Sequence, residues 1–186
     1  MKKKKQNKTI AIFCGSKLGK NTIYKNEVSA MASLLSKNGF KIIYGGGKIG
    51  LMGVIYKIYS NFNSSIIGII PKFLNKPKIR QQNKKNLKVV NSLHQRKVLM
   101  IKNADIFIIL PGGFGTLDEL FEILTLNQLN LYNKPVIIFN ISNYWKNLKL
   151  LIKTMQKEGF LYKQDIDNII WVNNNKNLIS ILNTLN

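Results

Sequence analysis

The chain has 186 residues, of which 45% are hydrophobic, so it can bury a sizeable core and is not a disordered protein. Its purely apolar runs are short, as at residues 106–110, and fall far below the roughly 20 residues that a membrane span needs. The formal net charge is +21, but the lysines are spread along the whole chain, which indicates a solvated surface and no specific nucleic-acid partner.

Residues 1–8 form a lysine-rich tail, and residues 9–186 are predicted to form one domain. The apolar run after the tail is too short for a signal peptide, so we expect a cytoplasmic protein. The single cysteine, Cys14, excludes an internal disulfide and gives no metal cluster.

Short β-branched runs alternate with helical stretches along the chain. The β-branched runs predict strands at residues 9–16, 40–46, 65–71, 87–91, 105–113, 134–140 and 167–173. The helical stretches predict helices at residues 21–38, 51–62, 93–104, 116–129 and 144–158, and an apolar run at 177–185 closes the chain. A basic, irregular loop is expected at 72–86. This rhythm predicts an α/β fold, a Rossmann-like doubly wound parallel sheet with helices on both faces.

Three strands end in glycine turns, and ligands of such sheets bind beyond the carboxyl ends of the strands. The turn at residues 15–20, GSKLGK, has one residue too few between its glycines for a P-loop, and Asn21 stands where a Ser or Thr must meet magnesium. The turn at residues 45–50, GGGKIG, fits the dinucleotide pattern, but no Asp or Glu follows about 20 residues later to hold a ribose. No nucleotide cofactor or metal is therefore expected.

The third turn, PGGFGTLDE at residues 111–119, carries the sharpest signal. Its glycines and the start of a helix suit a phosphate, yet three of the eight carboxylates in the chain follow at once, on Asp118, Glu119 and Glu122. One interpretation is structural, because Thr116 and Glu119 have the spacing of a capping box.

The other interpretation is catalytic. Cleavage of an N-glycosidic bond needs a phosphate held at a distance and a carboxylate beside the oxocarbenium-like transition state. One of only two arginines in the chain, Arg96, would offset the crowded carboxylates and bind substrate oxygens.

The motifs GSKLGK, YGGGKIGLMG, IGIIPK, HQRK and PGGFGTLDE occur here in the order and at the spacing of one family. The chain resembles the LOG ("Lonely Guy") family of cytokinin riboside 5'-monophosphate phosphoribohydrolases over about residues 10–182. The resemblance implies a homodimer without a cofactor. It also implies hydrolysis of N6-substituted adenosine 5'-monophosphates to the free base and ribose 5-phosphate.

The resemblance also assigns residues. The family's catalytic pair falls on Arg96 and Glu119. Its substrate-binding and phosphate-binding positions fall on Gly15, Ser16, Lys97, Gly112, Gly113, Phe114, Gly115, Thr116, Leu117, Asp118, Glu122 and Thr125. One departure concerns the base, because Lys78 stands where many relatives carry a substrate-contacting glutamate. The family's older name, lysine decarboxylase, finds no support in a pyridoxal-phosphate lysine pattern.

Two alternatives stay open at the level of the sequence. A broader nucleosidase would cleave AMP or other purine nucleoside 5'-monophosphates, and a non-catalytic protein would bind such nucleotides without turnover. The presence of both Arg96 and Glu119 argues against the non-catalytic alternative.

Overall fold

The computed structural model describes residues 8–185, so residues 1–7 of the predicted basic tail lie outside the described residues. Seven parallel strands form one sheet in the order β4-β3-β2-β1-β5-β6-β7. The strands are β1 (Thr9–Phe13), β2 (Lys41–Tyr44), β3 (Ile66–Pro71), β4 (Leu87–Val90), β5 (Ile106–Ile109), β6 (Val136–Phe139) and β7 (Ile169–Val172). The predicted doubly wound sheet is confirmed.

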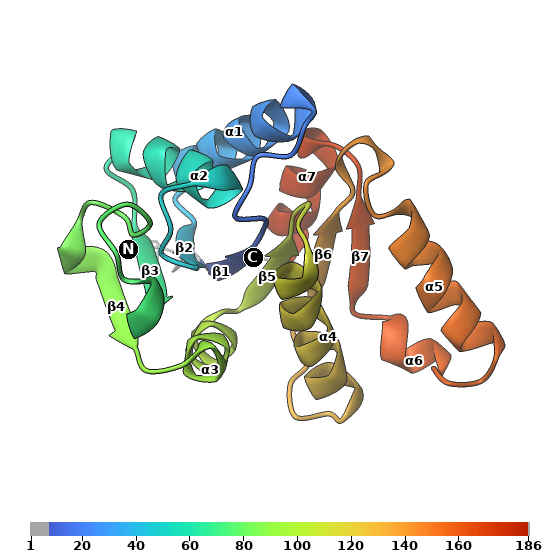
Figure 1. The fold of residues 1–186 in the computed structure, drawn as a ribbon. Helices are drawn as coiled ribbons and strands as arrows, with labels where there is room; N and C mark the ends of the chain where they lie inside the picture. Colours follow the sequence, from blue (N-terminus) through green and yellow to red (C-terminus); the bar gives the residue numbers. More distant parts are fainter. Residues whose placement is uncertain (1–7, 186) are drawn as a thin grey trace, which may run out of the picture.

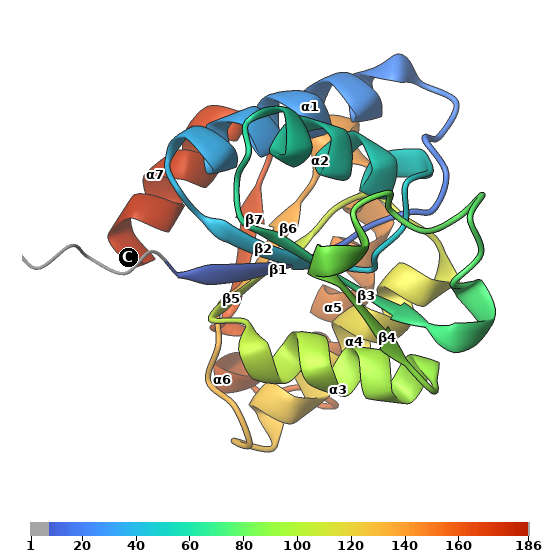
Figure 2. The ribbon, with the colours of Figure 1, turned by 90° about the vertical axis from the view of Figure 1, so that its left-hand side faces the viewer.

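Helices cover both faces of the sheet, as Figures 1 and 2 show. One layer contains α1 (Thr22–Lys37), α2 (Gly50–Asn61) and α7 (Asn175–Leu185), and the other contains α3 (Leu93–Asn103), α4 (Phe114–Gln128), α5 (Lys146–Lys157) and the short α6 (Lys163–Ile166). Each layer packs its own cluster of buried apolar side chains against the sheet. None of the described helices combines the length and apolar character that crossing a membrane requires.

Local sequence explains where the elements begin and end. Strands β5 and β6 are wholly apolar, and all four residues of each, IFII and VIIF, are buried, as expected for a parallel sheet covered on both faces. Helix α1 follows Asn21, whose side chain accepts a hydrogen bond from the backbone N–H of Ile23 at 2.9 Å. Helix α3 follows Ser92, whose hydroxyl accepts a hydrogen bond from the backbone N–H of Gln95. These caps fix the boundaries that the sequence pattern predicts only approximately.

The sheet order places a switch point between β1 and β5. The chain runs outward from β1 to β4 on one side, returns through α3, and continues from β5 to β7 on the other side. The turns after β1, β2 and β5 therefore lie at neighbouring positions on one edge. Gly50, with φ +61°, lets the turn after β1 cross the start of α2, because a Cβ there would lie 2.3 Å from the carbonyl oxygen of Ser16.

Candidate active site

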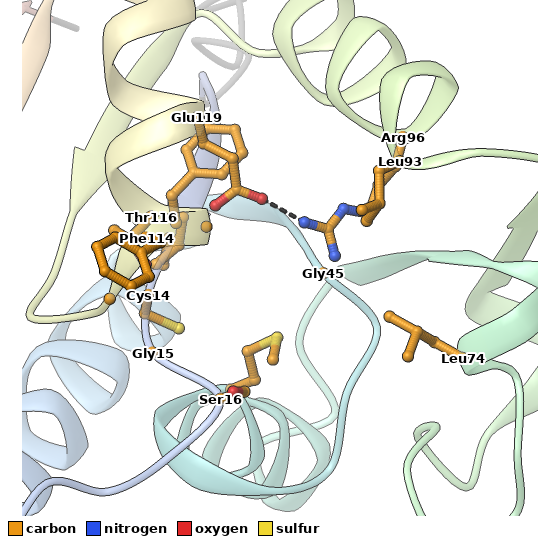
Figure 3. Close-up of a pocket in the computed structure, with 15 residues that line it drawn as sticks. Cys14, Gly15, Ser16, Gly45, Leu74, Leu93, Arg96, Phe114, Thr116 and Glu119 are labelled. Carbon is orange, nitrogen blue, oxygen red and sulfur yellow. Dashed lines mark hydrogen bonds and ion pairs between the residues drawn. The ribbon is translucent and has the colours of Figure 1, made fainter.

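A cavity of about 440 Å³ opens at this edge of the sheet, where the carboxyl ends of β1, β2 and β5 meet α3 and α4 (Figure 3). The cavity is lined by the end of β1 with its turn, by Gly45 after β2, by side chains from α2, α3 and segment 72–86, and by the first turn of α4. The lining residues are Ile12, Phe13, Cys14, Gly15, Ser16, Gly45, Met52, Leu74, Leu93, Arg96, Gly113, Phe114, Gly115, Thr116 and Glu119.

The turn after β5 is held tightly from two sides. The backbone N–H of Gly15 donates a hydrogen bond to the carbonyl of Pro111 at 3.0 Å, and the Tyr144 hydroxyl donates one to the carbonyl of Gly112 at 2.6 Å. Residue 112 must be glycine, because a Cβ there would lie 2.1 Å from Oγ1 of Thr116. By contrast, a Cβ at Gly113 or Gly115 would meet no atom within 4 Å, so the start of α4 faces open space.

The capping-box interpretation of Thr116 and Glu119 is wrong. Helix α4 begins at Phe114 and has Gly113 as its N-cap, without a side-chain cap. Thr116 lies inside the helix and is buried, and its backbone N–H donates to the carbonyl of Gly113 at 3.0 Å. The carboxylate of Glu119 is therefore not used to cap the helix.

Glu119 is instead paired with Arg96 across the cavity. An Nη2 hydrogen of Arg96 is donated to Oε1 of Glu119, and Figure 3 shows the two side chains pointing toward one another from α3 and α4. Only 13% of the Arg96 side chain and 8% of the Glu119 side chain are exposed. Burial raises the pKa of Glu119 to about 7, although the Arg96 guanidinium opposes the shift by favouring the carboxylate. Close to neutral pH this carboxyl group can thus both hold and release a proton.

A second cluster of ion pairs is centred on Lys97, the residue after Arg96 on α3. The Lys97 ammonium lies 2.9 Å from Oδ2 of Asp118 and 2.6 Å from Oε2 of Glu122. The burial of Lys97 lowers its pKa, but hydrogen bonding to Glu122 and Asp118 and the negative charges of both carboxylates together outweigh burial, so the net shift of the pKa is upward. The cluster ties α3 to α4 beside the cavity and accounts for the other two nearby carboxylates, on Asp118 and Glu122.

Eight of the residues predicted from the sequence line the cavity. They are Gly15, Ser16, Arg96, Gly113, Phe114, Gly115, Thr116 and Glu119. Phe114 stands at the opening and is 93% exposed.

The other predicted residues lie elsewhere. Lys97, Asp118 and Glu122 form the adjacent cluster. Gly112 and Leu117 line an apolar groove beyond the turn. Thr125 is exposed and lines a separate depression between α4 and α6, so this chain alone does not bring it to the cavity.

Sequence reasoning missed the apolar part of the wall. Met52, Leu74 and Leu93 line the cavity from three different segments, and Gly45 lies beside Arg96. None of these residues has a type or spacing that marks a binding site, since apolar residues at such positions fit a core equally well. The sequence also gave no indication that the hydroxyl of Tyr144, just before α5, donates a hydrogen bond to the turn after β5. Among residues 8–185, no group of three or more His, Cys, Asp or Glu side chains could hold a metal ion.

The fold and this cavity define a Rossmann-like protein with a candidate ligand site, which contains a buried ion pair, at the switch point of its sheet. A family model described as "Possible lysine decarboxylase" matches residues 52–182. The chain is 39% identical to the "Probable cytokinin riboside 5'-monophosphate phosphoribohydrolase LOGL3" of Oryza sativa subsp. japonica, over 83% of this chain and 73% of that protein. It is 40% identical to the cytokinin riboside 5'-monophosphate phosphoribohydrolase LOG1 of Arabidopsis thaliana, over 83% and 72% of the two chains. The chain therefore belongs to the LOG family, as its motifs predicted.

Solved structures with low sequence identity share the fold. The molybdenum cofactor binding protein from Rippkaea orientalis superposes with a TM-score of 0.73 at 16% identity, covering 97% of this chain and 98% of that one. At this identity the likeness concerns the fold alone, and the sheet with its two helical layers is common to both proteins.

Proposed function

We propose that this chain hydrolyses the N-glycosidic bond of N6-substituted adenosine 5'-monophosphates, which releases the free base and ribose 5-phosphate. The proposal rests above all on one observation. A buried carboxylate, Glu119, pairs with Arg96 in a cavity that the glycine-rich start of α4 also lines. The names of the LOG relatives describe the same reaction class.

The phosphate binds at the start of α4 in this proposal. The first turn of a helix has backbone N–H groups without partners inside the helix, and the helix dipole favours an anion there. The open space at Gly113 and Gly115 leaves room for phosphate oxygens to approach the backbone. Because the phosphate is remote from the bond that breaks, holding it orients the ribose toward Glu119.

Glu119 acts at C1' of the ribose. In its ionised form the carboxylate stabilises the positive charge that develops as the bond from C1' to the base nitrogen breaks. The electron pair of that bond leaves with the base, which takes up a proton from solvent. A water molecule bonds to C1' and gives its proton to Glu119, and this proton then returns to solvent.

Arg96 and Lys97 have different tasks in this reaction. Arg96 keeps Glu119 oriented and favours its ionised form, because the guanidinium donates a hydrogen bond to the carboxylate. Lys97 holds Asp118 and Glu122 and fixes α4 relative to α3.

A homodimer is part of the proposal, as the family resemblance implies. An apolar groove of about 470 Å³ runs between α4 and α5 next to the cavity. Its lining includes Phe114, Leu117, Phe121, Leu148 and Leu151. A second copy that covers this groove would remove the apolar side chains from water. Sedimentation velocity tests this part, and Leu151→Glu is expected to shift the wild-type dimer toward monomer, whereas a monomeric wild type would contradict it.

The activity is tested by a chromatographic assay for free base and ribose 5-phosphate. The substrates are isopentenyladenosine 5'-monophosphate, AMP and the nucleoside isopentenyladenosine. We expect cleavage of the isopentenyl nucleotide, slower cleavage of AMP, and no cleavage of the nucleoside, which lacks the phosphate. Equal rates for the two nucleotides would instead identify a broader purine nucleotide nucleosidase. Binding of AMP without release of base from any nucleotide would identify a non-catalytic nucleotide-binding protein.

A further inference from the structure

A side-chain amide lies wholly buried beneath the basic segment 72–86. Gln81 has no exposed surface, although the residues around it in this segment are mostly exposed. Its Oε1 accepts a hydrogen bond from the Tyr44 hydroxyl at 2.8 Å, and its Nε2 donates one to the carbonyl of Asn83 at 2.7 Å. The backbone N–H of Asn83 in turn donates to the hydroxyl of Tyr56 at 3.0 Å. A glutamine is rarely buried so completely, and here hydrogen bonds to its amide offset the cost.

The surrounding backbone is shaped to receive this side chain. A Cβ at Gly68 of β3 would lie 2.6 Å from Oε1 of Gln81, so residue 68 makes room for the amide. The rings of Tyr44 and Tyr56 stack with their centroids 6.5 Å apart beside it. The glutamine is thus held from β2, β3 and α2 together.

The same stretch of chain pairs with the glycine turn after β2. The backbone N–H of Gln81 donates to the carbonyl of Gly46 at 2.9 Å, and that of Lys48 donates to the carbonyl of Ile79 at 2.8 Å. Gly47 and Arg80 form an antiparallel bridge between these two bonds. The segment therefore lies against the turn in a fixed register.

The paired turn and the basic segment each contribute a residue to the cavity, Gly45 and Leu74. Gly45, next to the paired turn, lies so close to Arg96 that a Cβ there would be 3.4 Å from Nη1. Leu74, in the same basic segment, lines the cavity, and Figure 3 shows it across the open space from Phe114 and Thr116. With the phosphate at the start of α4, the opposite wall faces the base of a bound nucleotide.

We propose that Gln81 is a positioning residue for the base end of the substrate: through Tyr44 it fixes segment 72–86 on the turn at 46–48, and this places the wall that carries Leu74. The inference rests on the proposed function, because it takes the ligand to be a nucleoside 5'-monophosphate with its phosphate at α4. The wall is a built part of the site, held by a buried side chain, so its position contributes to binding before any substrate arrives.

The test uses two variants of the network and one matched control. Gln81→Leu removes both amide hydrogen bonds, and Tyr44→Phe removes only the bond to Oε1. Tyr59→Phe is the control, because Tyr59 is equally buried and its hydroxyl donates one hydrogen bond, at 3.2 Å to the carbonyl of Phe40, away from the cavity.

Steady-state kinetics with isopentenyladenosine 5'-monophosphate gives the first readout. Gln81→Leu is expected to raise KM roughly tenfold, and Tyr44→Phe roughly threefold, with kcat changed less than about twofold, because Arg96 and Glu119 stay in place. Inhibition by ribose 5-phosphate, which lacks the base, is expected to keep the wild-type inhibition constant. Tyr59→Phe is expected to keep the wild-type KM.

Limited trypsin digestion followed by mass spectrometry gives a second readout that needs no activity. Cleavage after Lys78, Lys84 and Lys85 is expected to be faster in Gln81→Leu and Tyr44→Phe than in the wild type and Tyr59→Phe. If Gln81→Leu does not fold, Tyr44→Phe carries both readouts.

The inference is overturned if both network variants keep the wild-type KM, if Tyr59→Phe raises KM as much as Tyr44→Phe, or if inhibition by ribose 5-phosphate weakens in parallel with KM. Failure of the proposed function looks different, since the wild type itself would then release no base. In that case unchanged trypsin cleavage in both network variants would overturn the structural part of the inference.

Discussion

Arg96 and Lys97 are neighbours on α3, and each pairs with carboxylates of α4, but their surroundings differ. The Arg96–Glu119 pair is almost completely buried, whereas Lys97 holds one carboxylate that is 63% exposed and another that is 24% exposed. Burial raises the pKa of Glu119 to about 7 despite the nearby guanidinium. Among three clustered carboxylates, burial rather than position in the sequence therefore distinguishes the one that is suited to chemistry.

The largest difference between the two pairs is expected when each glutamate in turn is replaced by glutamine. Glu119→Gln is expected to lower kcat roughly 1,000-fold, because it removes the charge that stabilises the transition state and accepts the proton. Glu122→Gln, the matched control, is expected to lower kcat less than about tenfold, since Glu122 only supports α4. Release of free base under saturating substrate measures both. Equal losses in the two variants would contradict the assignment of roles.

Removing each cation in turn shows how much each ion pair contributes to the free energy of unfolding. Arg96→Ala leaves Glu119 buried without its partner and is expected to lower the free energy of unfolding by roughly 3 kcal/mol at pH 8.5, where the carboxylate is charged. Urea denaturation followed by circular dichroism measures the loss. A loss below that of Lys97→Met would show that burial does not distinguish the pairs.

The stability of the folded protein is expected to depend on pH through Glu119. Because the pKa of Glu119 is higher in the folded protein than in the unfolded chain, the folded state keeps this proton to higher pH. The resulting stabilisation is fully present below about pH 4.5 and is lost as pH rises through about 7, a change on the order of 3 kcal/mol. Urea denaturation at pH 5 and pH 8 is expected to show this decrease in the wild type and not in Glu119→Gln. A decrease of the same size in the variant would assign it to other groups.

Activity is expected to follow the opposite direction. Since the reaction uses the ionised carboxylate, kcat/KM is expected to rise with pH and to level off above an apparent pKa of about 7. A rate that already levels off near pH 5 would contradict this expectation, because it would place the pKa of Glu119 near the ordinary value of a glutamate.

The smallest effect is expected at the cluster of Lys97, Asp118 and Glu122, because both of its carboxylates are more exposed than Glu119. Lys97→Met keeps the apolar stem of the side chain and removes the ammonium, and it is expected to lower the free energy of unfolding by less than about 1 kcal/mol. Asp118→Asn serves as its matched partner, and the double variant is expected to cost little more than Lys97→Met alone. A loss above that of Arg96→Ala would reverse the comparison.

The sequence was enough to predict the sheet, its helical layers and the edge that carries the site. The wholly apolar run at 106–109 and the glycine turns after β1, β2 and β5 carried that prediction, because period and turn chemistry are local properties. The start of α4 was misplaced by two residues. Thr116 and Glu119 match a capping box in spacing, and only the packing of α3 against α4 shows that Arg96 binds the carboxylate.

Contacts between distant segments explain the remaining misses. Leu74 and Leu93 look like ordinary apolar residues in the sequence, and their place in the cavity depends on how segment 72–86 and α3 lie on the sheet. The burial of Gln81 depends on Tyr44 and on the missing side chain at residue 68, which belong to two different strands. No local sequence pattern predicts these contacts, because the residues that meet are far apart along the chain and only the order of the strands brings them together.

The sheet order has a consequence for how activity is acquired during folding. The strands of the first half of the chain touch those of the second half only through the pairing of β1 with β5. Arg96 lies on α3, which follows β4 and ends the part of the chain before β5, and Glu119 lies on α4, which follows β5. The ion pair therefore joins the two parts of the chain across the seam, the boundary between β1 and β5. A refolding chain can build each half from short-range contacts, but it becomes an enzyme only when this seam closes. Because such long-range contacts form slowly, the return of activity reports the closing step rather than the earlier formation of helices.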